Sequence, residues 1–130
     1  MKFKIDPDNG APIFEQLIRQ IKFAIAEGVL VPGELIPSTR ELSRQLAINP
    51  NTVQRAFSQL QADEIIEAHR GRGVAVCQGA RRHCISERQN LVAERFSAAI
   101  DEALHSGLDV QQLRDLFEKQ LKKSSRDEGK

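Results

Sequence analysis

Apolar residues recur at helical spacing near the start of the chain, at Ile13, Leu17, Ile21, Ala24 and Ile25. This period predicts an amphipathic helix from Pro12 to Glu27, because proline is tolerated in a first turn and Gly28 favours a helix end. A turn at Pro32-Gly33 then leads into a short extended piece, residues 34–37.

Two shorter helices follow, and each begins with a residue that can cap it. Ser38 and Glu41 have the spacing of a capping box. Asn49 can cap a second helix, residues 49–61, in which Pro50 takes the first helical position. Its predicted apolar face consists of Val53, Ala56, Phe57 and Leu60. Because only about two residues separate these helices, they must cross as a helix-turn-helix, in which the second helix is the recognition helix.

A basic hairpin is predicted next, with strands at residues 64–69 and 74–76. The tip between them is Arg70-Gly71-Arg72-Gly73. The glycines supply the backbone freedom of a tight turn, and the arginines supply donors for phosphate or a narrow groove. A helix-turn-helix followed by such a hairpin is a winged helix. The predicted fold class is therefore mostly α with a small β-hairpin, and the predicted chemistry is docking on duplex DNA.

The last third of the chain shows two more helical patterns, one ending at Ser106-Gly107 and one capped by Asp109. A two-helix hairpin of about 35 residues has too small a core to be stable alone, so we expect it to form a homodimer. The predicted organisation is a winged helix-turn-helix DNA-binding domain (1–78), a helical dimerisation hairpin (79–121) and a disordered tail (122–130). Residues 78–86 are interpreted as a linker.

Charge supports this interpretation locally rather than globally. The 130-residue chain is 40% apolar and has a net charge of +1. Between Ser38 and Gln59, however, Arg40, Arg44 and Arg55 accompany the single acid Glu41.

Composition disfavours two other classes of protein. Six phenylalanines without tryptophan or tyrosine disfavour a stacking surface for single-stranded nucleic acid. The chain has no apolar run that could span a membrane and no signal-like start, so a cytoplasmic location is expected.

No residues suggest catalysis or a cofactor. Cys77 and Cys84 lie beside His83, but their spacing matches no common zinc pattern, so we expect ordinary thiols. A metal or redox role for them is the alternative. There is no recognisable nucleophile with its base and no phosphate-binding glycine loop, so we expect the chain not to be an enzyme.

Three strings carry a family resemblance: residues 32–43 (PGELIPSTRELS), 49–56 (NPNTVQRA) and 70–73 (RGRG). In order and spacing they closely resemble the GntR family of bacterial transcription regulators. With the two-helix C-terminal part, they are similar to its YtrA subfamily. The resemblance implies a dimeric repressor of a palindromic operator, often near genes for an ABC-type transporter. It leaves room for a small-molecule effector, whose identity no residue indicates.

The resemblance also implies DNA contacts for the start of the helix-turn-helix, for the recognition helix and for the hairpin tip. The residues at these positions are Arg40, Asn49, Asn51, Thr52, Gln54, Arg55, Arg70, Gly71, Arg72 and Gly73. Arginine can fork onto guanine or pin a phosphate, and glutamine can pair with adenine. Alternatives are an ion pair of Arg55 with Glu41, a capping role for Asn51 and Thr52, and a plain exposed Gln54.

Two departures from the family pattern change these expectations. Many relatives have an arginine where this chain has Pro50 and Asn51, so their base preference does not transfer. The glycine usual before the hairpin is replaced by Glu64, so the start of the hairpin is expected to differ.

A winged helix that binds another protein is the alternative function. It would need an apolar recognition face, whereas Asn51 and Gln54 are polar.

Overall fold

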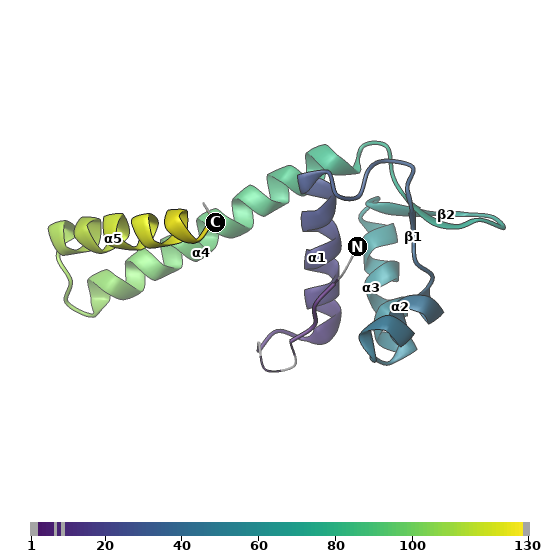
Figure 1. Ribbon diagram of the computed structural model, residues 1–130, viewed down its shortest axis with the longest axis horizontal. Coiled ribbons are helices and arrows are strands. Elements are labelled where there is room, and N and C mark those ends of the chain that lie inside the picture. The colour runs from purple at the N-terminus through teal and green to yellow at the C-terminus, as the bar shows by residue number, and fades with distance from the viewer. Residues whose placement is uncertain (1–2, 7, 9, 129–130) are drawn as a thin grey trace. The chain divides into compact units, whose positions relative to one another are not determined.

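The computed structural model describes residues 3–6, 8 and 10–128. Their elements follow in the order α1 (Ile13–Glu27), β1 (Leu35–Ile36), α2 (Thr39–Leu46), α3 (Pro50–Ala62), β2 (Ile66–His69), β3 (Gly73–Val76), α4 (Ala80–His105) and α5 (Val110–Glu128) (Figure 1). The chain forms two compact units, Met1–Gln89 and Asn90–Lys130. No helix in the described ranges combines the length and apolarity that a membrane span needs.

The core of the N-terminal unit lies where α1 packs against α3 (Figure 1). Its fully buried side chains include Leu17, Ile21, Ile25, Leu42, Val53 and Leu60. Apart from Leu42, these are apolar positions named for the predicted amphipathic helices, so the periodicity placed the core correctly. With α2 resting on α3, the unit has the predicted helix-turn-helix.

The sheet has three antiparallel strands in the order β1-β3-β2, rather than the hairpin alone. β2 pairs with β3 from Ile66 opposite Val76 to His69 opposite Gly73. The piece expected only to be extended, β1, pairs with the other edge of β3, at Ile36 opposite Val74. This pairing satisfies backbone groups that β3 would otherwise leave exposed.

Among the described residues, four helices end with a residue in the left-handed conformation, followed by the paired hydrogen bonds of a Schellman motif. Gly28 (φ 84°) and Gly107 (φ 104°) suit this position. Ala47 (φ 53°) and Glu64 (φ 60°) take it without being glycine. Glu64 therefore keeps the backbone turn that a glycine would favour. Because residues up to 65 close this helix end, β2 starts at Ile66 and not at residue 64 as predicted.

The N-terminal segment is held along α1 by two glutamines one turn apart. The buried side chain of Gln16 accepts a hydrogen bond from the Asp6 N–H (2.9 Å) and donates one to the Asp6 carbonyl (2.8 Å). Gln20 forms the same pair of bonds with Lys4. Phe3 and Ile5 pack against the core beside them.

The structure differs from three predictions about the later chain. Residues 78–86 are not a linker, because α4 begins at Ala80, and Ala80 and Cys84 are buried against the core. Residues 122–128 belong to α5 instead of a disordered tail, and 129–130 lie outside the described residues. The boundary between compact units falls after Gln89 rather than after residue 78.

The C-terminal unit contains the rest of α4 and all of α5. Asp109 caps α5 as predicted, accepting from the Gln112 N–H at 2.8 Å, while Gln112 accepts from the Asp109 N–H. Phe96 and Phe117 meet edge to face, with centroids 5.6 Å apart. None of residues 90–126 is buried, and Val92, Phe96, Leu104, Val110, Leu116, Phe117 and Leu121 are all exposed.

Candidate nucleic-acid interface

The candidate interface is built around the first two turns of α3. Asn49 caps the helix by accepting the Asn51 N–H at 2.8 Å, and Pro50 occupies the first helical position, as predicted. Val53 and Ala56 are buried, which turns Asn51, Gln54 and Arg55 outward, where they are exposed. The packing that fixes the helix therefore also fixes which polar groups it presents.

The helix before it, α2, starts at a comparable cap. Ser38 Oγ accepts the Glu41 N–H at 3.1 Å, as the capping box predicts. Arg40 lies exposed in the first turn of this helix. The left-handed Ala47 ends the helix and lets the chain turn directly to Asn49. The tight turn of the helix-turn-helix is thus produced at a single alanine.

Gln54 forms two weak hydrogen bonds, one to α2 and one within α3. Thr39 Oγ1 donates to Gln54 Oε1, and Gln54 Nε2 donates to Ser58 Oγ, both at 3.4 Å. At this length a hydrogen bond is easily exchanged for one to a ligand. The prediction did not include Thr39. In the sequence, only the position of Thr39 beside Arg40 in the first turn of α2 indicates that its side chain lies at the candidate interface.

Arg55 has a partner that the sequence did not reveal. Its guanidinium carbon lies 3.8 Å from the centre of the Phe14 ring in α1, a cation–π contact. The alternative of an ion pair with Glu41 is not seen. In the part of the chain that the structure describes, Arg40, Arg44, Arg55, Arg70 and Arg72 form no ion pair. Their charges are therefore free to meet phosphates.

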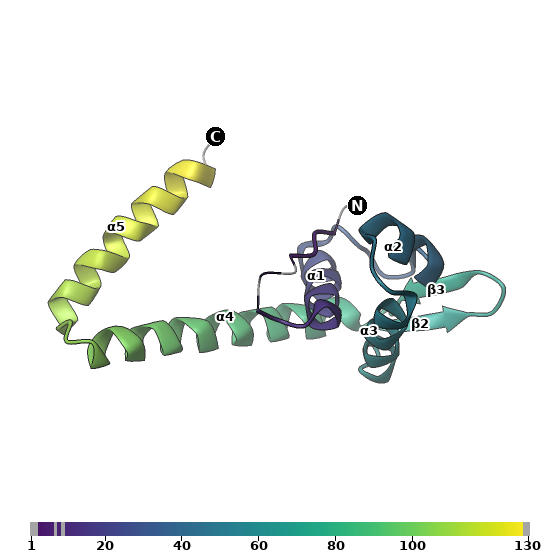
Figure 2. The same ribbon diagram turned by 90° about the horizontal axis from the view of Figure 1, so that it is seen from below.

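The hairpin tip, residues 70–73, is the wing, and it projects beyond the helices of its unit (Figure 2). Gly71 (φ 77°) and Gly73 (φ 107°) have left-handed backbones, and Arg72 N–H donates to the His69 carbonyl at 2.9 Å. A Cβ at either glycine would have no neighbour within 4 Å. The glycines are thus required by backbone conformation, not by packing. Arg70 and Arg72 are both exposed.

The opposite end of α3 has the other sign of charge. An open groove there is lined by three carboxylates, Asp63, Glu64 and Glu67, together with Cys77 and His83. Phosphates would be repelled from these carboxylates, so the charge distribution favours the start of α3 as the DNA-facing end.

The two thiols are held in their neutral form. Burial raises the pKa of Cys77, and the nearby Glu67 and Glu64 raise it further. Burial, helped by Glu87, raises the pKa of Cys84 to about 11. A thiolate is the reactive and metal-binding form of cysteine, so both residues are poorly suited to those roles at neutral pH.

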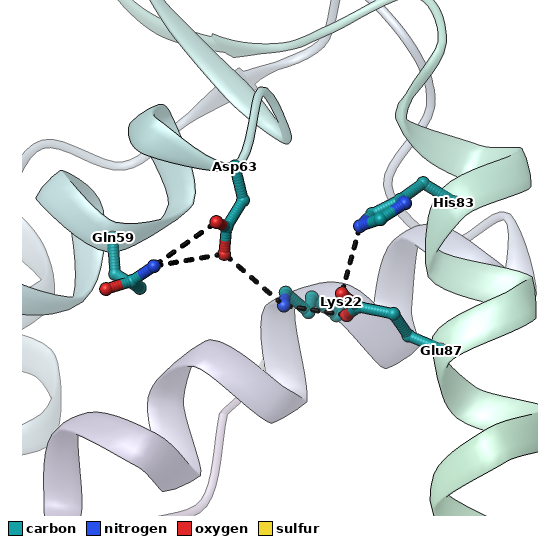
Figure 3. A network of polar contacts seen from close by, with 5 residues as sticks. All are labelled: Lys22, Gln59, Asp63, His83 and Glu87. Atoms are coloured by element: carbon teal, nitrogen blue, oxygen red, sulfur yellow. Dashed lines mark hydrogen bonds and ion pairs between the residues drawn. The ribbon is translucent and has the colours of Figure 1, made fainter.

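A polar network joins α1, the end of α3 and the start of α4 (Figure 3). Lys22 Nζ lies 2.7 Å from Glu87 Oε2 and 3.8 Å from Asp63 Oδ2. Gln59 donates to both oxygens of Asp63 at 3.2 Å, and His83 Nε2 lies 2.9 Å from Glu87 Oε1. The network fixes the first turns of α4 on the helix-turn-helix, which explains why they are not a linker.

Known proteins resemble both the sequence and the structure. The family described as "Bacterial regulatory proteins, gntR family" matches residues 13–76, which contain every element from α1 to β3. The HTH-type transcriptional repressor YtrA of Bacillus subtilis (strain 168) is 34% identical over 110 residues, which cover 85% of each chain.

Two solved structures extend the likeness to the fold. A transcriptional regulator from Oenococcus oeni matches with a TM-score of 0.73 and 28% identity, over 90% of this chain and 97% of that one. YtrA from Sulfolobus acidocaldarius, a GntR-family transcription factor, matches with a TM-score of 0.58 and 32% identity, over 74% and 97%. The predicted family is thereby confirmed: the chain belongs to the gntR family of bacterial regulatory proteins and is a DNA-binding transcriptional regulator.

Proposed function

We propose that this regulator binds a palindromic operator as a homodimer and represses the genes that follow it. The observation that carries the proposal is the capped start of α3, where polar side chains are exposed and the nearby arginines have no ion-pair partner among the described residues. Helix-turn-helix proteins place this part of the recognition helix in the major groove, and dimers read two half-sites.

In this proposal, three groups of residues make different kinds of contact with DNA. Arg40 at the start of α2 contacts the phosphate backbone, which sets the register of the protein on the duplex. The recognition helix reads base edges and adjacent phosphates through Asn49, Asn51, Thr52, Gln54 and Arg55. The wing grips the backbone or minor groove through Arg70, Gly71, Arg72 and Gly73.

The dimer part of the proposal is supported by the C-terminal unit. A pair of helices in which none of residues 90–126 is buried has no core of its own. Its exposed apolar side chains need a partner, and a second copy of the same unit supplies one with matching chemistry.

We further infer a cytoplasmic, non-enzymatic role, because the relatives are transcription regulators.

A footprint on the DNA upstream of its own gene tests this function. We expect protection of two symmetric half-sites. Arg72→Ala should weaken binding to all sequences and reduce the slope of log affinity against log salt by about one. Arg126→Ala removes an exposed arginine of α5 and serves as the matched control, with affinity and slope unchanged. Absence of any protected nucleotides at low salt would contradict DNA binding, and a single asymmetric site would contradict the palindromic operator.

A further inference from the structure

Phe14 lies on α1, outside the helix-turn-helix, yet it touches a side chain of the proposed DNA interface. The Arg55 guanidinium carbon is 3.8 Å from the centre of its ring. Phe14 itself is half-buried and packed against the hydrophobic core, whereas Arg55 is exposed. The ring is therefore the fixed partner, and the arginine is the mobile side chain that the contact holds in place.

The chemistry of this contact leaves Arg55 able to bind DNA. A guanidinium donates all five of its hydrogen bonds in its own plane. Stacking on an aromatic ring uses the face of that plane and consumes no donor. Since Arg55 forms no ion pair within the described ranges, its fork of donors has no protein carboxylate as competitor.

We propose that Phe14 is a positioning residue for DNA binding: its ring orders the Arg55 guanidinium before DNA arrives. An unrestrained arginine loses much rotamer freedom when it binds, and this loss weakens affinity. Because the contact with Phe14 already restricts the Arg55 side chain in the free protein, this rotamer freedom is lost on folding and not on DNA binding. The inference rests on the proposed contact between Arg55 and DNA, and it adds α1 to the elements that determine affinity.

A double-mutant cycle tests the proposal, with affinity for the footprinted duplex measured by fluorescence anisotropy at one salt concentration. We expect Phe14→Leu to weaken binding roughly two- to tenfold, the cost of ordering one long side chain. In an Arg55→Ala background, the same substitution should have no further effect. Phe14→Tyr keeps an aromatic face and should bind like the unsubstituted protein.

Phe23→Leu is the matched control, because Phe23 is a half-buried phenylalanine of the same helix without an arginine on its ring among the described contacts. The affinity of the Phe23→Leu variant for the duplex should stay unchanged. Circular dichroism melting confirms that each variant is folded. Equal losses for Phe23→Leu and Phe14→Leu, or an undiminished Phe14→Leu effect in the Arg55→Ala background, would overturn the proposal.

The remaining outcomes separate this inference from the proposed function. If the unsubstituted protein binds and Arg72→Ala weakens it, but Phe14→Leu has no effect, only the positioning role is refuted. If Arg55→Ala has no effect either, the proposed contact between Arg55 and DNA fails together with the positioning role, while operator binding stands. If the unsubstituted protein protects no DNA at all, the proposed operator binding and the positioning role both fail.

Discussion

Glu64 occupies a backbone conformation that its side chain does not favour. It is the left-handed residue of the Schellman motif after α3, with φ of 60°. A Cβ in this conformation approaches the carbonyl oxygen and costs roughly 1–2 kcal/mol, a cost that glycine avoids. Ala47 bears the same cost at the turn of the helix-turn-helix.

Glu64→Gly is therefore expected to stabilise the protein by about 0.5–1 kcal/mol, after the greater freedom of glycine in the unfolded chain is subtracted. Urea denaturation measures the free energy of unfolding. Ala62→Gly, two residues earlier in the helical last turn of α3, is the control and should destabilise by about 1 kcal/mol. A loss of stability for Glu64→Gly would show that the backbone there is not strained.

Cys84 makes stability depend on pH in the alkaline range. Its pKa in the fold is about 11, against 9.0 ordinarily, because the thiol is buried. Well below pH 9 the thiol is protonated in both states and its contribution is constant. Between pH 9 and 11 mainly the unfolded chain loses the proton, so the folded state loses stability as pH rises.

Between about pH 8 and about pH 10.5, the protein should lose about 2 kcal/mol more unfolding free energy than Cys84→Ala does. Both are measured by urea denaturation, so that the variant subtracts all other titrating groups. Parallel pH profiles would mean that the Cys84 thiol ionises in the fold as easily as in the unfolded chain.

At the scale of elements, the start of α4 is held by interactions that are distant in sequence. Lys22, whose side chain is only 15% exposed, lies between Glu87 of α4 and Asp63 after α3. Removing its charge leaves two carboxylates close together without a shared cation. Their mutual repulsion should loosen α4 from the core.

Lys22→Met is expected to cost about 1–2 kcal/mol of stability, between the values for exposed and buried ion pairs. Amide hydrogen exchange should quicken in the first turns of α4, residues 80–89. Lys119→Met, at an exposed position of α5, is the control and should change neither quantity. Unchanged exchange in residues 80–89 of Lys22→Met would show that apolar packing alone holds them.

The same elements show how far the sequence predicts the structure. The starts of α2, α3 and α5 were predicted correctly because their caps, Ser38, Asn49 and Asp109, act within three residues of the chain. The start of α4 was missed because Ala80 and Cys84 become buried only through tertiary packing. The Phe14–Arg55 stack was missed for the same reason, since it joins helices whose relative placement no local pattern encodes.

At the scale of the whole molecule, assembly should control DNA binding. The C-terminal unit exposes apolar side chains along α4 and α5, among them Phe96, which is 49% exposed. A carboxylate introduced there would have to be desolvated in the proposed dimer.

Phe96→Asp should therefore shift the protein to monomers in sedimentation equilibrium and weaken operator binding at least tenfold, because one half-site then binds alone. Ser97→Asp places the same charge at the next exposed position and is the control, with smaller effects on both measurements. A Phe96→Asp protein that stays dimeric would exclude this surface from the dimer interface.

The buried and exposed faces of α3 have different roles. Val53, Ala56, Phe57 and Leu60 anchor the helix, while Asn51, Gln54 and Ser58 point away from the core and contribute little to it. If the proposed interface is correct, substitutions at Asn51 and Gln54 would therefore alter target preference at almost no thermodynamic penalty to folding. A gene duplicate could drift toward a new promoter through these sites alone, which makes this helix a ready starting point for diversification and for laboratory retargeting.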